Sequence, residues 1–393
     1  MANEVDISER WLLENHPKAF AELLMDYATG QNIYWATESY VERGEGFGFF
    51  DPITIDKIKD DTVIRPRARK SLEEQTRRVK EKAEVFTPSW ICNAQNNLVD
   101  DAWFGRKEVF NREITLPDGS HDWEVTERPI RFGKSHDKHT KRSWIQYVKD
   151  RRLEITCGEA PYLISRYDTV SGVPIPIEKR IGMLDRKLQV ISENEHTPKK
   201  WFDRVQDAIK ATYGFEWQGD SLLLAREAAL LSILDYFFAK FPDEPGKEIN
   251  RQKFSRMINK CAHFIACNLW QMDGLNFVLP GTSDRQFELP SVAAAKKWKA
   301  LQEKKAEKLK QESCQLPLFS EDELGELDED SVMPDYSHLD PDFESKRKEA
   351  PAILEALRKG EPSPEPSGIP AVVYDWFPKK EKQYFAALVN HNE

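Results

Sequence analysis

Cysteine is scarce in this chain of 393 residues, and it is widely scattered. The five cysteines are odd in number and include no Cys-x-x-Cys pair; they stand at positions 92, 157, 261, 267 and 314. Disulfide frameworks and structural zinc sites normally need paired or closely spaced cysteines. We therefore expect no disulfide framework, no bound metal and a reducing compartment.

Long apolar runs are missing as well. No segment approaches the ~18 apolar residues that span a bilayer. The beginning of the chain, MANEVDISERWLLENHP, carries acids where a secretory signal has a basic end and an apolar core. We therefore expect an intracellular, cytoplasmic protein without a membrane partner.

Acidic residues outnumber basic ones, and the formal net charge is −10, but the excess acids are unevenly distributed along the chain. Much of the excess acid lies in SEDELGELDEDS at residues 320–331, which is typical of a solvated linker. By contrast, residues 65–82 and 128–152 are rich in lysine and arginine. A basic face on an acidic protein can still bind phosphate, so the negative net charge does not exclude a nucleic-acid partner.

A His-x-x-His spacing occurs within HDKHTKR at residues 136–142. No cysteine or third ligand stands near it, whereas zinc sites need three or four ligands. We expect a solvated basic loop there, for which contact with phosphate is the better functional use.

Apolar patterning divides the chain into four parts. Residues 1–80 are mostly helical with an aromatic, glycine-rich stretch, and residues 81–280 alternate short apolar runs with amphipathic helical ones. Residues 281–368 are a charged helix and an acidic, proline-rich, flexible linker, and residues 369–393 predict a strand and a helix. The alternation in the second part favours an α/β fold with βαβ units and a mainly parallel sheet.

Three strands are predicted in that second part, and each carries an acid near its end. The first contains Glu154 and stops at Gly158, the second contains Glu216, and the third ends near Asp273. The predicted spans are 152–156 and 212–218 for the first two strands, and 199–212 and 222–241 for two helices.

Ligands of open α/β sheets bind outside the carboxyl ends of the strands. A glycine there lets the backbone approach a ligand, one acid can accept both ribose hydroxyls, and another can accept from an adenine amino group. The alternative is an ordinary strand, turn and helix whose acids only cap turns.

The series of motifs resembles that of adenine-specific DNA methyltransferases of the restriction-modification kind. VFTP at residues 85–88 is followed by LEITCGEAPYL, YGFEWQGDSLLLARE and NLWQMDGL, and the series covers residues 84–275, about half of the chain. The resemblance implies a Rossmann-like doubly wound sheet that binds S-adenosylmethionine. More loosely, the whole chain is similar to bacterial and phage proteins labelled restriction or modification methylase.

Each motif of that family has a place on the cofactor. A Phe-Thr-Pro-like element packs against the methionine end, a strand ending in Asp-Pro-x-Cys-Gly-x-Gly forms the cofactor turn, and two later acids bind the ribose and the adenine. Carried over by position, the implied cofactor-binding residues are Phe86, Thr87, Pro88, Glu154, Cys157, Gly158, Ala160, Glu216 and Asp273.

The chain departs from the family pattern at two places. In the cofactor turn, Glu154-Ile155 replaces Asp-Pro and Ala160 replaces the second glycine. The catalytic tetrapeptide, in which Asn, Asp or Ser precedes Pro-Pro and an aromatic residue, is missing, because the chain contains no Pro-Pro. The nearest candidate is VVYDWFP at residues 372–378, with Asp375 to accept from the target amine and Trp376 to stack on the base. The alternative for both residues is a structural role after an apolar strand.

A second motif, QLPLF, lies inside the polar third part. It resembles the short motif by which bacterial replication and repair proteins bind the sliding clamp, and the implied contact residues are Gln315, Leu316, Leu318 and Phe319. An isolated apolar pentapeptide in a polar stretch suits docking into a partner's pocket. The alternative is that it packs back on its own protein.

These observations favour an S-adenosylmethionine-dependent DNA methyltransferase that modifies the amino group of adenine in a restriction-modification or phage context. The alternative is a catalytically degenerate relative that binds DNA and the sliding clamp as an adaptor in anti-phage defence or counter-defence. A methyltransferase of RNA or protein stays open.

Overall fold

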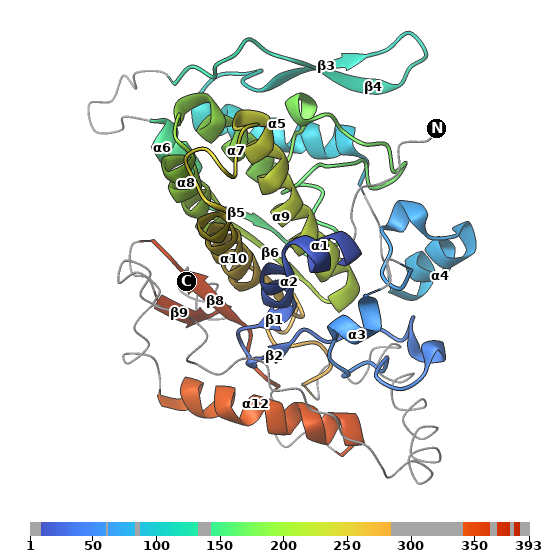
Figure 1. The fold of residues 1–393 in the computed structure, drawn as a ribbon. Coiled ribbons are helices and arrows are strands. Elements are labelled where there is room, and N and C mark those ends of the chain that lie inside the picture. Colours follow the sequence, from blue (N-terminus) through green and yellow to red (C-terminus); the bar gives the residue numbers. More distant parts are fainter. Residues whose placement is uncertain are drawn as a thin grey trace.

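The computed structural model describes residues 9–59, 62–82, 87–132, 143–283, 341–361, 368–377 and 381–385, and its fold is mixed α/β (Figure 1). The centre is a parallel three-stranded sheet in the order β5-β6-β7. Its strands are β5 at Arg152–Glu154, β6 at Thr212–Glu216 and β7 at Leu269–Gln271. All three predicted strands are confirmed, although β5 and β6 are shorter than predicted. The described residues hold three parallel strands, so the doubly wound sheet stays a prediction.

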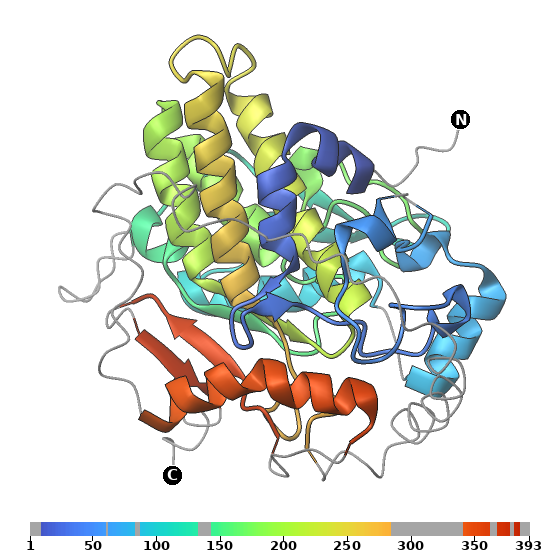
Figure 2. The same ribbon diagram turned by 60° about the horizontal axis from the view of Figure 1, so that its bottom comes forward.

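Two helices connect each pair of neighbouring parallel strands. Between β5 and β6 run α7 (Met183–Asn194) and α8 (Pro198–Lys210), and between β6 and β7 run α9 (Gly219–Lys240) and α10 (Arg251–Asn268). Both connections proceed in the same direction along the sheet, so right-handed crossovers place these helices over one face (Figure 2). Nearly all of α9 is buried, which is why its sequence lacks a polar face.

An antiparallel hairpin covers part of the other face. It consists of β8 (Val372–Asp375) and β9 (Glu381–Tyr384). The Tyr213 hydroxyl donates to the Tyr374 carbonyl at 3.1 Å, and the Phe385 ring lies 5.7 Å from the rings of both Phe215 and Trp270. The predicted C-terminal strand is confirmed as β8, whereas β9 was not predicted.

Described segments from the N-terminal and C-terminal parts of the chain share the core with the sheet. One cluster of buried apolar side chains extends from Leu12 through the sheet and its helices to Trp376. Helix α2 (Pro17–Leu24) contacts α10 closely, and a smaller cluster joins α12 (Pro341–Lys359) to Tyr34 and Phe49. The remaining elements are α1 (Glu9–Asn15), β1 (Met25–Asp26), β2 (Gln31–Asn32), η1 (Val41–Arg43), α3 (Ile55–Ile58), η2 (Arg67–Arg69), α4 (Leu72–Lys82), α5 (Ser89–Phe104), β3 (Asn111–Thr115), β4 (His121–Val125), α6 (Trp144–Val148) and η3 (Ile177–Lys179).

Candidate functional site

The turn after β5 has an unusual backbone. Thr156, Gly158 and Ala160 have φ angles of +47°, +55° and +59°. Glycine adopts such angles without strain, whereas a β-branched threonine or an alanine does so at a cost of about 1–2 kcal/mol. Ala160 is the position at which the methyltransferase pattern has a glycine, and its side chain is fully buried. The positive φ at Ala160 explains why a glycine suits this place.

The carboxylate of Glu216 joins this turn to the end of β6. One oxygen accepts the Gly158 N–H at 2.8 Å, and the other accepts the Gln218 N–H at 3.1 Å. The Cys157 N–H donates to the Phe215 carbonyl at 2.8 Å. The sheet therefore brings together the predicted cofactor turn and the acid predicted to bind ribose.

Two further carboxylates, those of Glu154 and Glu159, accept hydrogen bonds that hold the rest of the turn in place. Glu154 accepts the backbone N–H groups of residues 162 and 163 at 3.3 and 3.1 Å. Glu159 accepts the Arg67 N–H at 2.6 Å and the Tyr167 hydroxyl at 2.5 Å. Glu154 therefore shapes the loop that carries the candidate site.

Neighbouring acidic side chains affect the pKa values of Glu154 and Cys157. Burial raises the pKa of Glu154 well above its usual value, and the neighbouring Glu216 carboxylate adds to the rise. Burial, followed by the charges of Glu154 and Glu216, raises the pKa of the Cys157 thiol well above its usual value. Because a thiol is a weak nucleophile, Cys157 serves as a small packing residue.

Asp273 shapes the turn after β7 at the same edge. Its carboxylate accepts the Leu275 N–H at 2.8 Å, the Asn276 N–H at 3.3 Å and the Asn276 side-chain amide at 2.7 Å. A Cβ on Gly274 would lie 2.8 Å from the Phe215 ring, so only glycine fits there without a shift. The predicted adenine-binding acid therefore lies at a strand end but also holds its own turn.

Thr87 and Ser89, on either side of Pro88, contact the loop that follows the predicted cofactor turn. The Thr169 hydroxyl donates to the Thr87 carbonyl at 3.3 Å. The Asp168 carboxylate accepts the N–H of Ser89, the first residue of α5, at 2.7 Å. The structure thus places the segment that contains Thr87 and Pro88 beside the loop after β5. Phe86 lies outside the described residues.

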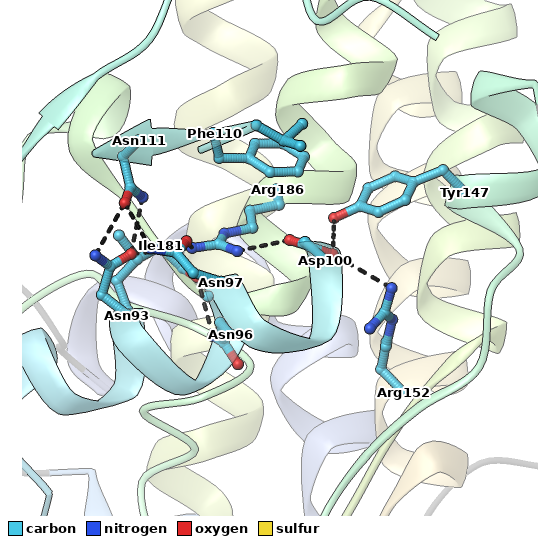
Figure 3. A network of polar contacts seen from close by, with 12 residues as sticks. Asn93, Asn96, Asn97, Asp100, Phe110, Asn111, Tyr147, Arg152, Ile181 and Arg186 are labelled. Atoms are coloured by element: carbon cyan, nitrogen blue, oxygen red, sulfur yellow. Dashed lines mark hydrogen bonds and ion pairs between the residues drawn. The ribbon is translucent and has the colours of Figure 1, made fainter. Parts of the chain in front are cut away.

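A buried polar network fixes α5 against β5 and α7 (Figure 3). The Asp100 carboxylate accepts from Arg186 at 2.6 Å, from Tyr147 at 3.0 Å and from Arg152 at 3.3 Å. Arg186 also donates to Asn93 at 3.0 Å. Because a buried charge without its partner is costly, this network sets the position of the helix that begins after Pro88.

Asp375 and Trp376 lie elsewhere. Asp375 pairs with Arg151 at 2.7 Å, directly before β5, and the Trp376 indole N–H donates to the Asn268 side chain at 2.7 Å, directly before β7. The Trp376 ring is buried and stacked on Tyr374. Both residues therefore lie at the amino ends of the strands, and the structure does not bring them to the cofactor turn.

A charged cluster beside the site was not predicted from the sequence. The buried Asp220, at the start of α9, accepts from Tyr40 at 2.8 Å and pairs with Arg78 at 3.0 Å and Lys70 at 3.9 Å. Burial opposes ionisation of Asp220, but Arg78 and Lys70 hold its pKa below the usual value. Arg78 also donates to Gln218 at 3.0 Å. Two cations of the basic stretch 65–82 are thus structural anchors, which no local pattern could indicate.

The aromatic N-terminal stretch lies along the same edge. The Gln271 side chain accepts from the Tyr34 N–H at 3.2 Å and donates to the carbonyls of Tyr34 and Trp217 at 2.8 and 2.9 Å. The Trp217 indole donates to the Ala36 carbonyl at 3.0 Å. A segment without a recognisable motif therefore forms part of the wall beside Glu216.

The turn after β5 lacks the arrangement of a phosphate-binding turn. A phosphate usually sits on a helix N-terminus that follows the glycine turn directly. Here no described α-helix begins between β5 and Met183, and carboxylates surround the turn. A sulfonium and an ammonium are cations, and a carboxylate oxygen that accepts an N–H can also accept a hydroxyl. The residues present are therefore compatible with this cofactor.

The remaining sequence predictions concern metals, membranes and two short motifs. Among the described residues, no group of three histidine, cysteine or acidic side chains could hold a metal ion. None of the described helices combines the length and apolarity needed to cross a membrane. The QLPLF residues 315–319 and the basic loop 136–142 lie outside the described residues. Comparisons with protein-family models, curated proteins and solved structures found no match to this chain.

Proposed function

We propose that this chain is an S-adenosylmethionine-dependent methyltransferase that acts on DNA, on the amino group of adenine. The observation that carries the proposal is the contact between the Glu216 carboxylate and the Gly158 N–H. It joins a strained turn to a strand-end acid at the edge where ligands of α/β sheets bind. The doubly wound sheet belongs to the same proposal.

In this proposal, the residues at the carboxyl edge of the sheet contact different parts of the cofactor. Glu216 accepts from the ribose hydroxyls, and Asp273 accepts from the adenine amino group of the cofactor. Glu154, Cys157, Gly158 and Ala160 form the turn that the cofactor lies against, and Phe86, Thr87 and Pro88 flank its methionine end. The cofactor supplies a methyl group activated by the sulfonium, so the protein contributes mainly alignment of that group with the amine.

DNA is the proposed substrate because the sequence contains two stretches rich in lysine and arginine. Cations of residues 65–82 and 128–152, apart from the buried Lys70, Arg78 and Arg152, would contact phosphates, which makes affinity fall steeply as salt rises. Asp375 and Trp376 lie at the opposite edge, so we assign the target amine to neither. We assign that task to no other described residue.

A second candidate is an adaptor that retains the cofactor site without turnover. The chain has no Pro-Pro tetrapeptide, and the nearest replacement pairs with Arg151 away from the turn. QLPLF at residues 315–319 would then dock on a sliding clamp. Measured affinity for purified clamp should fall when Gln315, Leu318 and Phe319 become alanine, and an unchanged affinity removes this part of the proposal.

Transfer of tritiated methyl from the cofactor to a mixed DNA pool tests the enzyme directly. Label in DNA that is abolished in Glu216→Ala but retained in Asp375→Ala supports the proposal. Competition with RNA and with denatured protein identifies the preferred substrate. Cofactor binding without label in any polymer favours the adaptor.

A further inference from the structure

Two stacked aromatic side chains lie on the surface beside the start of α5. The rings of Trp90 and His121 have centroids 4.1 Å apart and planes inclined by 21°. Trp90 lies in the first turn of α5 and is 39% exposed, and His121, the first residue of β4, is also exposed. A second stacked pair, Tyr374 and Trp376, is buried in the core. The stacked aromatic pair of Trp90 and His121 is therefore accessible to solvent.

Anchoring of the β3–β4 hairpin does not account for this exposed stack. Trp123, on the same strand, is buried against Cys92 and Ile181, and its indole N–H donates to the Lys179 carbonyl at 2.8 Å. The Lys179 ammonium also pairs with Asp122 at 3.0 Å. The hairpin is thus fixed by a buried contact and an ion pair beside the stack.

The position of the stack links it to the proposed site. Trp90 follows Ser89, whose N–H is held by Asp168, and Asp168 begins the loop that contacts Thr87. Val173 of this loop is 60% exposed. Trp90 and Val173 are therefore two exposed apolar side chains near Thr87, the residue that the proposal assigns to the methionine end of the cofactor.

We propose that Trp90 and His121 form a platform on which a nucleobase of the DNA substrate stacks. This inference rests on the proposed function, because it places the platform beside the methionine end of the cofactor. Every base has a flat π face, so aromatic platforms hold single-stranded or extruded bases without reading their sequence. The platform is a positioning element, since nothing in its geometry gives it a role in methyl transfer.

The test uses the full-length protein and a single-stranded oligonucleotide of mixed sequence containing 2-aminopurine, whose fluorescence falls when it stacks. Trp90→Ala should weaken binding roughly tenfold and remove the quenching, whereas Trp90→Phe should retain most of both. The salt dependence of binding should stay unchanged, because no phosphate contact is lost.

Trp11→Ala is the matched control. Trp11 is 41% exposed and also lies beside a histidine, His16, at 5.6 Å, but it belongs to α1. Its replacement should leave oligonucleotide binding at the wild-type level. Circular dichroism of both alanine variants shows whether each is folded. If Trp90→Ala is not folded, the oligonucleotide affinity of Trp90→Phe serves as the measurement instead.

The outcomes separate the platform from the proposed function. If Trp90→Ala binds the oligonucleotide as tightly as Trp11→Ala does, or if Trp90→Phe loses as much affinity as Trp90→Ala, the platform is wrong. A parallel titration with S-adenosylmethionine reports on the proposed function alone. Cofactor binding that survives in Trp90→Ala, together with lost oligonucleotide binding, supports the platform.

Discussion

The Glu216 carboxylate and the Gly158 backbone N–H lie 2.8 Å apart, although 58 residues separate them in the chain. The parallel pairing of β5 and β6 makes this contact possible, because it sets the two carboxyl ends side by side. Glu216 therefore holds the turn in place. A bound cofactor would have to share its carboxylate oxygens with the backbone N–H groups that they already accept.

Ala160 provides a test of the turn's strain. Ala160→Gly should be neutral or slightly stabilising, within about 1 kcal/mol, because relief at φ +59° offsets the entropy that glycine adds to the unfolded chain. Ala208→Gly in α8, also fully buried, should instead destabilise by about 1 kcal/mol or more. Urea unfolding of both variants measures the difference, and equal losses would contradict a strained Ala160.

Arg226 is predicted to be essential for joining α2 to the sheet. Its buried guanidinium donates to the carbonyls of Leu23, Met25, Ala266 and Leu269 at 2.6 to 3.0 Å. Arg226→Met would leave these acceptors buried and unpaired, so we expect a loss of roughly 3 kcal/mol or more in unfolding free energy.

The control for Arg226 is an exposed arginine in an ion pair. Arg112 is 57% exposed and pairs with Glu124 on the β3–β4 hairpin. Arg112→Ala should leave the unfolding free energy close to the wild-type value, because solvent screens an exposed ion pair. Comparable losses for the two variants, measured by urea unfolding, would contradict the role given to Arg226.

His263 makes stability depend on pH. Burial alone would lower its pKa, but contacts with Cys267 and Glu22 raise it to about 10. A raised folded pKa stabilises the protein fully below pH ~6.5, the unfolded value, and this stabilisation is lost as pH rises through about 10. Wild type should lose on the order of 2 kcal/mol more than His263→Gln between pH 6 and 10. Parallel pH profiles in urea unfolding would refute the assignment.

Asp375→Ala should leave cofactor affinity unchanged. The residue lies at the amino ends of the strands, and its partner Arg151 is 52% exposed, so the ion pair contributes about 1 kcal/mol or less. Calorimetric titration with S-adenosylmethionine measures the affinity. A tenfold weaker affinity in this variant would mean that Asp375 reaches the cofactor site after all.

Local patterns predicted the elements of the sheet well. LEITCGEAPYL and YGFEWQ combine buried strands with turn residues, so the sequence alone locates β5, β6 and the glycine turn. The alternation of strands and helices also implies parallel neighbours, which is why Glu216 and Gly158 are expected at one edge.

Contacts between distant segments could not be predicted. Arg78 and Lys70 belong to a stretch that looks like a basic surface, yet they are buried beside Asp220. Asp375 and Trp376 follow an apolar strand, but the sequence does not say at which end of the sheet β8 finishes. Both features depend on how β8 and α4 pack, and local periodicity carries no information about that packing.

Calorimetric titration of the purified protein with S-adenosylmethionine tests the central claim most directly. Wild type should bind, Glu216→Ala should bind at least roughly tenfold more weakly because the ribose hydroxyls lose a charged acceptor, and Glu216→Gln should fall between them. The glutamine variant keeps an oxygen that can accept the Gly158 N–H, but it has no negative charge. It therefore distinguishes an affinity loss caused by a disrupted turn from one caused by a weaker contact with the ribose. Folded wild type that does not bind, or equal affinity in wild type and Glu216→Ala, would contradict the account.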